Sequence, residues 1–213
     1  NTIDWFDYST RTGIMQNYSA SVSGATEKMN YYLSGTYTDQ EGVVKGDDYD
    51  RTVLTARIQT DITNWLQVGG QVNYAYNDYS GPSVYDLYQA IRLSPYGRAE
   101  RADGGGVEKF PVNEGIYRIN PLWNVESGTI DDHDTYSTVS MKGHALVKCP
   151  WIEGLTYRLN GSYSIENIER DYFTHEGYYV KEGTGDDRYS ESAVSDYLAS
   201  ANGYSARTKN TSW

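Results

Sequence analysis

The chain has 213 residues, which is enough for one large domain, with a net charge of −11 at pH 7 and a hydrophobic content of 38%. This acidic balance argues against a nucleic-acid partner, which requires clustered Lys and Arg, and the single Cys149 excludes an internal disulfide. No run of about 18 apolar residues occurs, so no membrane-spanning helix is predicted. The 22 tyrosines suit a membrane interface or a wet binding surface, because their rings are apolar and their hydroxyls polar.

The first four predicted strands follow from strict alternation of apolar and polar residues. They cover residues 16–24, 29–39, 51–62 and 65–77. In the clearest of them the odd positions are apolar, as at Tyr31 and Leu33, and the even positions are polar, as at Ser34. Because a strand directs successive side chains to opposite faces, each stretch predicts one apolar face and one face of hydroxyls and amides.

Residues 78–134 interrupt this pattern and predict a long loop. The loop contains one predicted helix, residues 83–93, because Val84, Leu87 and Ile91 recur at helical spacing. Two more alternating strands are predicted at residues 135–148 and 155–166. The last stretch, residues 170–213, is polar, rich in tyrosine and predicted to be mostly irregular, and residues 206–212 do not resemble a terminal strand.

The predicted turns alternate between short and long along the chain. Short turns lie at residues 24–28, 63–64 and 149–154, whereas the long connections are residues 40–50, 78–134 and 170–213. Outer-membrane barrels keep short turns on the periplasmic side and long loops outside. We therefore predict an all-β fold, an antiparallel transmembrane β-barrel segment of about six strands with long extracellular loops. The alternative for each strand is a soluble antiparallel sheet with one buried face.

The alternation also predicts which side chains meet lipid and which line a water-filled lumen. The lipid-facing set is Tyr31, Leu33, Tyr37, Val68, Val72, Tyr74, Leu159 and Tyr163. The lumen-facing set is Asn30, Ser34, Gln71, Asn73, Asn160 and Ser162.

The sequence does not indicate catalytic chemistry. His133, His144 and His175 lie far apart, and none has a partner at metal-ligand spacing. The acidic run at residues 131–134 has two interpretations, a cation-binding loop or a solvated acidic loop. No nucleophile and base are arranged together, so we predict no enzyme activity, no catalytic residues, no metal site and no cofactor.

Aromatic residues in the long loops are the candidates for ligand contact, because rings stack on sugars and peptides while polar neighbours orient them. The same rings can instead serve loop packing. The predicted ligand-binding residues are Tyr117, Trp123, Tyr178 and Tyr179, with Asp131, Asp132, Asp186 and Asp187 as acidic neighbours.

A series of motifs follows in order within residues 2–80. They include Thr2-Ile-Asp-Trp-Phe-Asp, Gln16-Asn-Tyr-Ser-Ala-Ser-Val-Ser-Gly, Lys28-Met-Asn-Tyr-Tyr-Leu-Ser-Gly, Tyr37-Thr-Asp-Gln-Glu-Gly and Asn64-Trp-Leu-Gln-Val-Gly-Gly. In this order and at this spacing they resemble the early barrel of SusC-like TonB-dependent outer-membrane transporters, the SusC/RagA family of Bacteroidetes. The resemblance is looser beyond Asp78, although Gly154-Leu-Thr-Tyr-Arg fits another strand of that family.

The resemblance implies that residues 1–213 are part of the barrel domain of such a receptor, without its plug domain. Family members are barrels of about 22 strands in the Gram-negative outer membrane. They import glycans, or sometimes peptides, with a SusD-like surface lipoprotein and with energy that TonB delivers through the plug. We therefore expect these partners and membrane lipid, no nucleic acid, and extracellular long loops. About six strands cannot close a barrel, so the segment is not expected to transport alone.

The alternative function is a soluble or surface-attached carbohydrate-binding β-sheet domain, in which the same tyrosines form a binding face. A hydrolase is a third alternative, which the lack of paired catalytic groups disfavours. A reading frame with a plug and further barrel strands on either side of this segment would favour the transporter.

Overall fold

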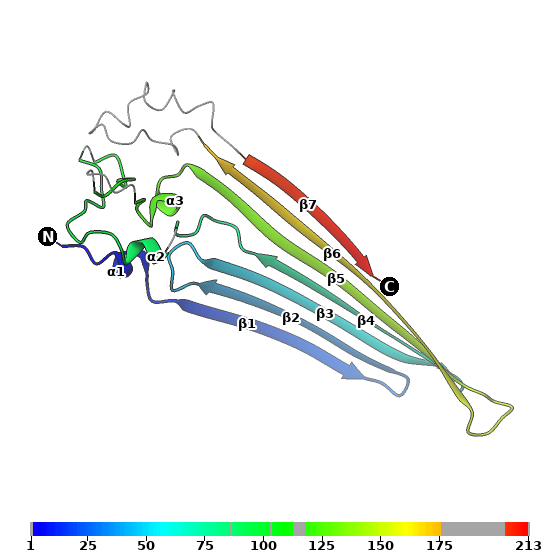
Figure 1. Ribbon diagram of the computed structural model, residues 1–213. Helices are drawn as coiled ribbons and strands as arrows, with labels where there is room; N and C mark the ends of the chain where they lie inside the picture. The colour runs from blue at the N-terminus through cyan, green and yellow to red at the C-terminus, as the bar shows by residue number, and fades with distance from the viewer. Residues whose placement is uncertain (1, 86, 103, 113–117, 176–202, 213) are drawn as a thin grey trace.

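The computed structural model describes residues 2–85, 87–102, 104–112, 118–175 and 203–212. Within these ranges the chain forms one seven-stranded antiparallel sheet, in which each strand pairs with its neighbour in sequence, from β1 to β7 (Figure 1). The first and last strands do not pair with each other. The predicted all-β antiparallel fold is therefore confirmed, as an open sheet.

The strands are longer than the alternation predicts. Their bounds are β1 (Ile14–Ala25), β2 (Met29–Glu41), β3 (Asp48–Thr63), β4 (Leu66–Asp78), β5 (Ile130–Lys148), β6 (Thr156–Thr174) and β7 (Gly203–Ser212). Strand β5 starts at Ile130 instead of residue 135, and β6 ends at Thr174 instead of residue 166. The reason is that these two strands pair with each other in unbroken register from Ile130 opposite Thr174 to Lys148 opposite Thr156.

Strand β7 corrects the prediction that the end of the chain is irregular. It pairs antiparallel with the C-terminal half of β6, with Ser212 opposite Ser164 and Gly203 opposite Phe173. Its sequence shows no apolar alternation, because polar residues occupy both of its faces. An Arg207–Glu169 ion pair of 3.8 Å and the amide of Asn210, which donates to Glu166, join it to β6. Pairing with β6, and not an apolar–polar alternation in its own sequence, therefore defines this strand.

The short turns all lie at one end of the sheet, and the helices and the described parts of the longer connections lie at the other (Figure 1). Side-chain hydroxyls close two of the short turns. The Thr26 hydroxyl accepts from the backbone N–H of Met29 at 3.1 Å, and the Thr63 hydroxyl accepts from the N–H of Leu66 at 3.0 Å. These compact turns fix the register of the hairpins that they join. We call the opposite end of the sheet the long-loop end.

Three short helices and two small apolar clusters lie at the long-loop end. Helix α1 (Trp5–Ser9) begins after Asp4, whose carboxylate accepts from two backbone N–H groups of its first turn. Helices α2 (Leu87–Ala90) and α3 (Trp123–Glu126) lie within the connection between β4 and β5. Trp5 packs against Ala90 and Leu93, so the first residues of the chain are anchored to that connection. None of the described helices is long or apolar enough to cross a membrane.

The predicted helix at residues 83–93 is wrong in length, because among its described residues only Leu87–Ala90 is helical. The backbone N–H of Tyr85 donates to the carbonyl of Pro121 at 3.0 Å instead of to a carbonyl of its own segment. The apolar stripe that predicted the helix is nevertheless partly covered. Of its residues Val84 is buried, whereas Ile91 is 61% exposed. The stripe therefore serves packing of a compact loop rather than a regular amphipathic helix.

Candidate functional site

The register of the sheet places the predicted lipid-facing side chains on one face. Directly paired positions run across the strands in rows. One row near the middle of the sheet contains Val22, Leu33, Ala56, Val72, Met141 and Tyr163. The next row toward the long-loop end contains Ala20, Gly35, Leu54, Tyr74, Val139 and Ile165. We call this side of the sheet the apolar face.

The apolar face is not covered by any described part of the chain. Leu33 is 49% exposed and Leu54 is 50% exposed, which is unusual for leucines at the centre of a sheet. Two apolar hollows of about 730 and 620 Å³ lie between its side chains. A face of this size that remains apolar and uncovered marks a contact with lipid or with another apolar surface.

Tyrosines and then carboxylates terminate the apolar face at the long-loop end. Tyr18, Tyr37 and Tyr76 share one row, and Asp39, Asp50 and Asp78 share the row immediately beyond it. The Tyr37 hydroxyl donates to Asp50 at 3.0 Å, and the Tyr76 hydroxyl donates to Asp78 at 3.4 Å. An apolar band followed by aromatic rings and then by charge is the layering expected where a protein passes from hydrocarbon to headgroups and water.

The opposite side of the sheet, which we call the polar face, carries hydroxyls and amides. One of its rows consists of Ser21, Ser34, Thr55, Asn73, Ser140, Ser164 and Ser212. The Thr55 hydroxyl donates to Oδ1 of the Asn73 side chain at 3.1 Å, and the Ser140 and Ser164 hydroxyls lie 3.1 Å apart. All six predicted lumen-facing residues, from Asn30 to Ser162, lie on this face.

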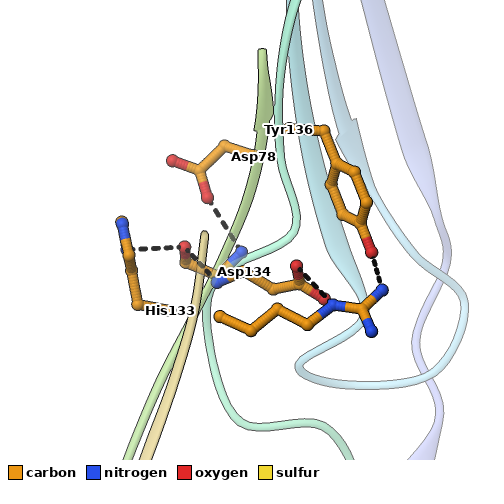
Figure 2. A network of polar contacts seen from close by, with 6 residues as sticks. Asp78, His133, Asp134 and Tyr136 are labelled. Atoms are coloured by element: carbon orange, nitrogen blue, oxygen red, sulfur yellow. Dashed lines mark hydrogen bonds and ion pairs between the residues drawn. The ribbon is translucent and has the colours of Figure 1, made fainter. Parts of the chain in front are cut away.

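Ser80 is the centre of a polar network that holds the long loop to the sheet (Figure 2). Its hydroxyl contacts Nδ1 of His133 at 3.0 Å and accepts from the backbone N–H of Asp134 at 3.2 Å. Its own backbone N–H donates to Asp78 at 2.8 Å. Burial acts to raise the pKa of Asp78, but hydrogen bonds from Ser80 and Tyr76 and the nearby His133 together outweigh it, so the pKa lies below its ordinary value.

Arg170 extends this network across β5 and β6. Its Nε donates to Asp134 at 3.3 Å, and its guanidinium contacts the Tyr136 hydroxyl (Figure 2). The backbone N–H groups of Tyr79 and Gly81 also donate to carbonyls of β5, each at 2.9 Å. The chain therefore leaves the sheet only after Gly81, whose φ of +117° is readily adopted by glycine alone.

Three tyrosines form a ring cluster on the polar face beside this network. The centroids of Tyr49 and Tyr79 lie 4.8 Å apart, and those of Tyr79 and Tyr136 lie 5.6 Å apart in an edge-to-face contact. The Tyr79 side chain is still 47% exposed, so part of its surface is free for a ligand. The Arg170 guanidinium lies over the Tyr136 ring at 5.4 Å. The cluster combines apolar ring surface with charge and hydrogen-bonding groups.

The structure describes only some of the predicted ligand-binding residues. Tyr117, Tyr178, Tyr179, Asp186 and Asp187 lie outside the described residues. Trp123 is only 4% exposed and packs against Val107, with the ammonium of Lys109 5.4 Å above its ring. Its position suits loop packing.

Asp131 and Asp132 lie in strand β5 rather than in a loop. A carboxylate oxygen of Asp131 lies 2.5 Å from Nε2 of His175, at the point where β6 ends. Burial and the nearby charge of Asp134 raise the pKa of Asp132. Because adjacent residues of a strand point to opposite faces, the acidic run does not converge on one point. No group of three or more His, Cys, Asp or Glu side chains in the described ranges is arranged to hold a metal ion.

Sequence reasoning missed Tyr49, Tyr79 and Tyr136, although a signal was present. Tyr49 and Tyr79 each lie two residues outside a predicted strand and continue its polar-face parity, whereas Tyr136 is the second residue of the predicted strand 135–148. Alternation, extended by two residues for Tyr49 and Tyr79, would have placed all three on the polar face. Their mutual contact still required the register between strands, which one sequence does not specify.

The chain is similar to TonB-dependent receptors of the bacterium Formosa agariphila. It is 26% identical to TonB-dependent receptor P3 over 180 residues, covering 78% of this chain and 17% of the receptor. It is 33% identical to receptor P26 over 126 residues, covering 59% of this chain and 12% of the receptor. The chain thus spans about a sixth or less of the length of these relatives. No protein-family profile matches it.

The fold is similar to part of the RagAB peptide importer. In the closed-closed state of that complex the TM-score is 0.67 at 18% identity, covering 86% of this chain and 21% of the importer chain. A second RagAB structure, described as a peptide transporter, gives a TM-score of 0.66 at 19% identity and covers 20% of that chain. The predicted resemblance to a partial barrel segment of SusC-like TonB-dependent transporters is therefore confirmed.

Proposed function

We propose that residues 1–213 form part of the barrel wall of an outer-membrane TonB-dependent nutrient importer. The height of the apolar face is the observation that carries this proposal. In β4 the face extends from Leu66 to Tyr76. At about 3.3 Å per residue and a strand tilt of about 40°, this segment spans about 25 Å, which matches the apolar band of outer-membrane barrels. The similarity to TonB-dependent receptors supports the same assignment.

In this proposal the apolar face contacts lipid and the polar face lines the lumen. The short turns face the periplasm and the long-loop end faces outside, as in outer-membrane barrels generally. The remaining strands, the plug and the contact with TonB belong to parts of the protein beyond these residues, and the chain's share of its relatives' length leaves room for them. A SusD-like lipoprotein would cover the long-loop end. The segment itself carries no enzymatic step.

The substrate is proposed to be a glycan or a peptide that meets the ring cluster of Tyr49, Tyr79 and Tyr136 on its way into the lumen. Tyrosine rings stack on sugar and peptide surfaces, and the adjacent Asp134 and Arg170 supply hydrogen-bonding and charged groups. The predicted contacts Tyr117, Tyr178, Tyr179, Asp186 and Asp187 remain predictions for the same end of the barrel.

The alternative of a carbohydrate-binding domain in water is disfavoured by the uncovered apolar face. A stable sheet in water buries one face, whereas here both Val22 and Leu54 are half-exposed on the face that lacks polar groups. In the proposed barrel, lipid covers this apolar face.

Paired cysteine labelling of the full-length protein in isolated outer membranes tests the proposal. Leu33→Cys should react with a membrane-soluble maleimide and resist a charged one, because the side chain meets lipid. Ser34→Cys, one residue away, should show the reverse preference. Equal labelling of both positions by the charged reagent, or recovery of the protein in the soluble fraction, would contradict the proposal.

A further inference from the structure

Strand β7 differs from the other described strands in the side on which its cations lie. The Lys and Arg residues of β1 to β6 all lie on the polar face, namely Arg51, Arg57, Lys142, Lys148, Arg158 and Arg170. On β7, by contrast, Lys209 lies in the row of Tyr76 and Arg207 lies in the row of Asp78. Both cations of β7 are therefore on the side of the apolar face.

The apolar side chains on this side end nearer the short turns on β6 than on β2. Toward the long-loop end, their run stops at Tyr37 on β2 but at Ile165 on β6, one row earlier. At the other limit β2 begins at Met29, whereas the run on β6 continues one row farther, to Tyr157. Tilted strands that cross a flat hydrocarbon layer show such a shift. The apolar band therefore lies closer to the short turns at β6 and β7.

Lys209 and Arg207 lie just beyond the limit of this band. Lys209 is one row beyond Ile165, and Arg207 is two rows beyond it. Positions on one face of a strand are about 6.6 Å apart, so at a tilt of about 40° each row adds about 5 Å of height. A headgroup layer is about 5–8 Å thick. The position of Lys209 is therefore within the headgroup layer at the long-loop end, and that of Arg207 is at its outer limit.

The groups at these positions are hydrogen-bond donors with unused capacity. Within the described ranges no carboxylate forms an ion pair with Lys209, whose side chain is exposed. Arg207 contacts Glu169 only at 3.8 Å, and its side chain is 70% exposed. The amide of Asn167, opposite Lys209, has two N–H groups, one of which donates to Ser137 at 3.4 Å. An ammonium, a guanidinium and an amide side by side suit a phosphate group.

The charge of the same layer elsewhere on the sheet is of the opposite sign. Asp39, Asp50 and Asp78 follow the tyrosine row on β2 to β4. Three strand spacings, about 14 Å, separate Asp78 from Arg207, which exceeds the screening length of about 8 Å at physiological ionic strength. Glu169, on the neighbouring strand, can neutralise only one of the two cations. An anionic headgroup is therefore repelled at β2 to β4 and attracted at β7.

We propose that the outward side of β7, with Lys209, Arg207 and Asn167, binds the phosphate of a phosphorylated glycolipid in the outer leaflet of the outer membrane. The inference rests on the proposed function, since it requires the apolar face to contact lipid and the long-loop end to face outside. The acyl chains of the glycolipid would continue along the apolar side chains of β6, from Ile165 toward Tyr157. The site is continuous with the lipid contact and separate from the lumen.

Retention of glycolipid by the full-length protein, extracted from outer membranes in mild detergent, tests this inference. Native mass spectrometry measures the bound phosphorylated glycolipid. Arg207→Gln combined with Lys209→Gln should reduce the retained amount roughly tenfold, because charged hydrogen bonds to the phosphate are lost. Arg207→Lys combined with Lys209→Arg keeps both charges and should retain the glycolipid. Arg51→Gln combined with Arg57→Gln removes the same charge from the polar face and should also leave retention unchanged.

A second measurement uses the unaltered protein, so that it does not depend on the folding of a variant. Delipidated protein should rebind the purified glycolipid but not the same glycolipid after removal of its phosphate. Neither inorganic phosphate nor phosphatidylglycerol should displace the bound glycolipid. Displacement by either, rebinding of the dephosphorylated form, or equal retention by the two Gln double variants would overturn the inference and leave the proposed barrel wall intact. Recovery of the protein in the soluble fraction would instead contradict the proposed function itself.

Discussion

If one face of the sheet contacts lipid, neighbouring residues of one strand should tolerate a charged substitution to very different degrees. Leu33 lies in the central row of the apolar face, and Ser34 lies in a row of hydroxyls on the other side. We expect Leu33→Arg to destabilise the folded full-length protein in lipid vesicles by about 2–4 kcal/mol and Ser34→Arg to cost much less. Urea unfolding of both variants measures the difference, and equal losses would contradict the assignment of faces.

Tyr79 is the residue of the ring cluster with the most free surface. In the proposed importer, we expect Tyr79→Ala to weaken substrate binding by on the order of 1 kcal/mol, a factor of about five in Kd. Tyr79→Phe should retain most of the affinity, because the ring rather than the hydroxyl makes the stacking contact. Tyr18→Ala, which removes an exposed tyrosine from the apolar face, is the matched control and should leave Kd unchanged.

Asp78 and Asp132 have pKa values shifted in opposite directions, so their effects on stability have opposite signs. Because the pKa of Asp78 is lowered, its carboxylate stabilises the fold at pH values above 3.8, the ordinary pKa of this group. This stabilisation is lost as the pH falls through the folded-state pKa. The raised pKa of Asp132, caused mainly by burial, means that its ionised form destabilises the fold once the pH exceeds the folded-state pKa.

We therefore expect Asp78→Asn to lower the unfolding midpoint at pH 7 and Asp132→Asn to raise it. Below about pH 3 both differences should shrink, since both carboxylates are then increasingly protonated in the folded and unfolded states. Thermal unfolding of the two full-length variants at both pH values tests this. If the unfolding midpoints of both variants shifted in the same direction at pH 7, this would contradict the opposite effects that we assign to Ser80 beside Asp78 and to burial and Asp134 beside Asp132.

At the scale of elements, the connection between β4 and β5 is a compact unit rather than a free loop. The Trp5 indole donates to the carbonyl of Ser94 at 2.8 Å, and its ring is 3% exposed. Trp5→Ala should remove about 3–5 kcal/mol of local packing and expose residues 87–99 to protease. Phe6→Ala, at an adjacent position that is 50% exposed, should leave the digestion pattern unchanged. Equal digestion of both variants would show that α1 does not anchor the loop.

The hairpins were predictable from sequence, because period-two alternation and short turns are local signals. Strand β7 and the far ends of β5 and β6 were not, since there polar residues occupy both faces and only pairing with a neighbour defines the strand. The helix at residues 83–93 failed for a related reason. Its apolar spacing was real, but Tyr85 bonds to Pro121 from a distant segment, and tertiary contacts overrode the helical periodicity.

The candidate site was less predictable than the fold. Whether Thr55 and Ser140 share a row depends on the register of two successive strand pairs, which follows from turn geometry that alternation alone does not give. Contact between Tyr79 and Tyr136 likewise depends on residues 57 positions apart. Trp123 was predicted as a ligand contact from its loop position, and only the packing around it shows that its ring is enclosed.

At the scale of the whole molecule, the two edges of the sheet determine whether these residues can fold alone. Among the described strands β1 pairs only with β2, and β7 pairs only with β6. Each edge leaves a row of backbone N–H and C=O groups without strand partners, and hydrocarbon supplies no water to satisfy them. We therefore expect residues 1–213, produced alone and diluted from urea into lipid vesicles, to aggregate instead of inserting.

The full-length protein is the control, because further strands of the proposed barrel would cover both edges. It should insert, resist protease and change its mobility in gel electrophoresis on heating, as folded membrane barrels do, whereas the isolated segment should do none of these. Adding lysines to the edge strand β1 should make the segment more soluble without making it insert, since charge blocks edge pairing but does not satisfy backbone groups in lipid. Protease-resistant insertion of the isolated segment as a monomer would contradict the role of the open edges and, with it, the proposal that these strands are one part of a larger barrel.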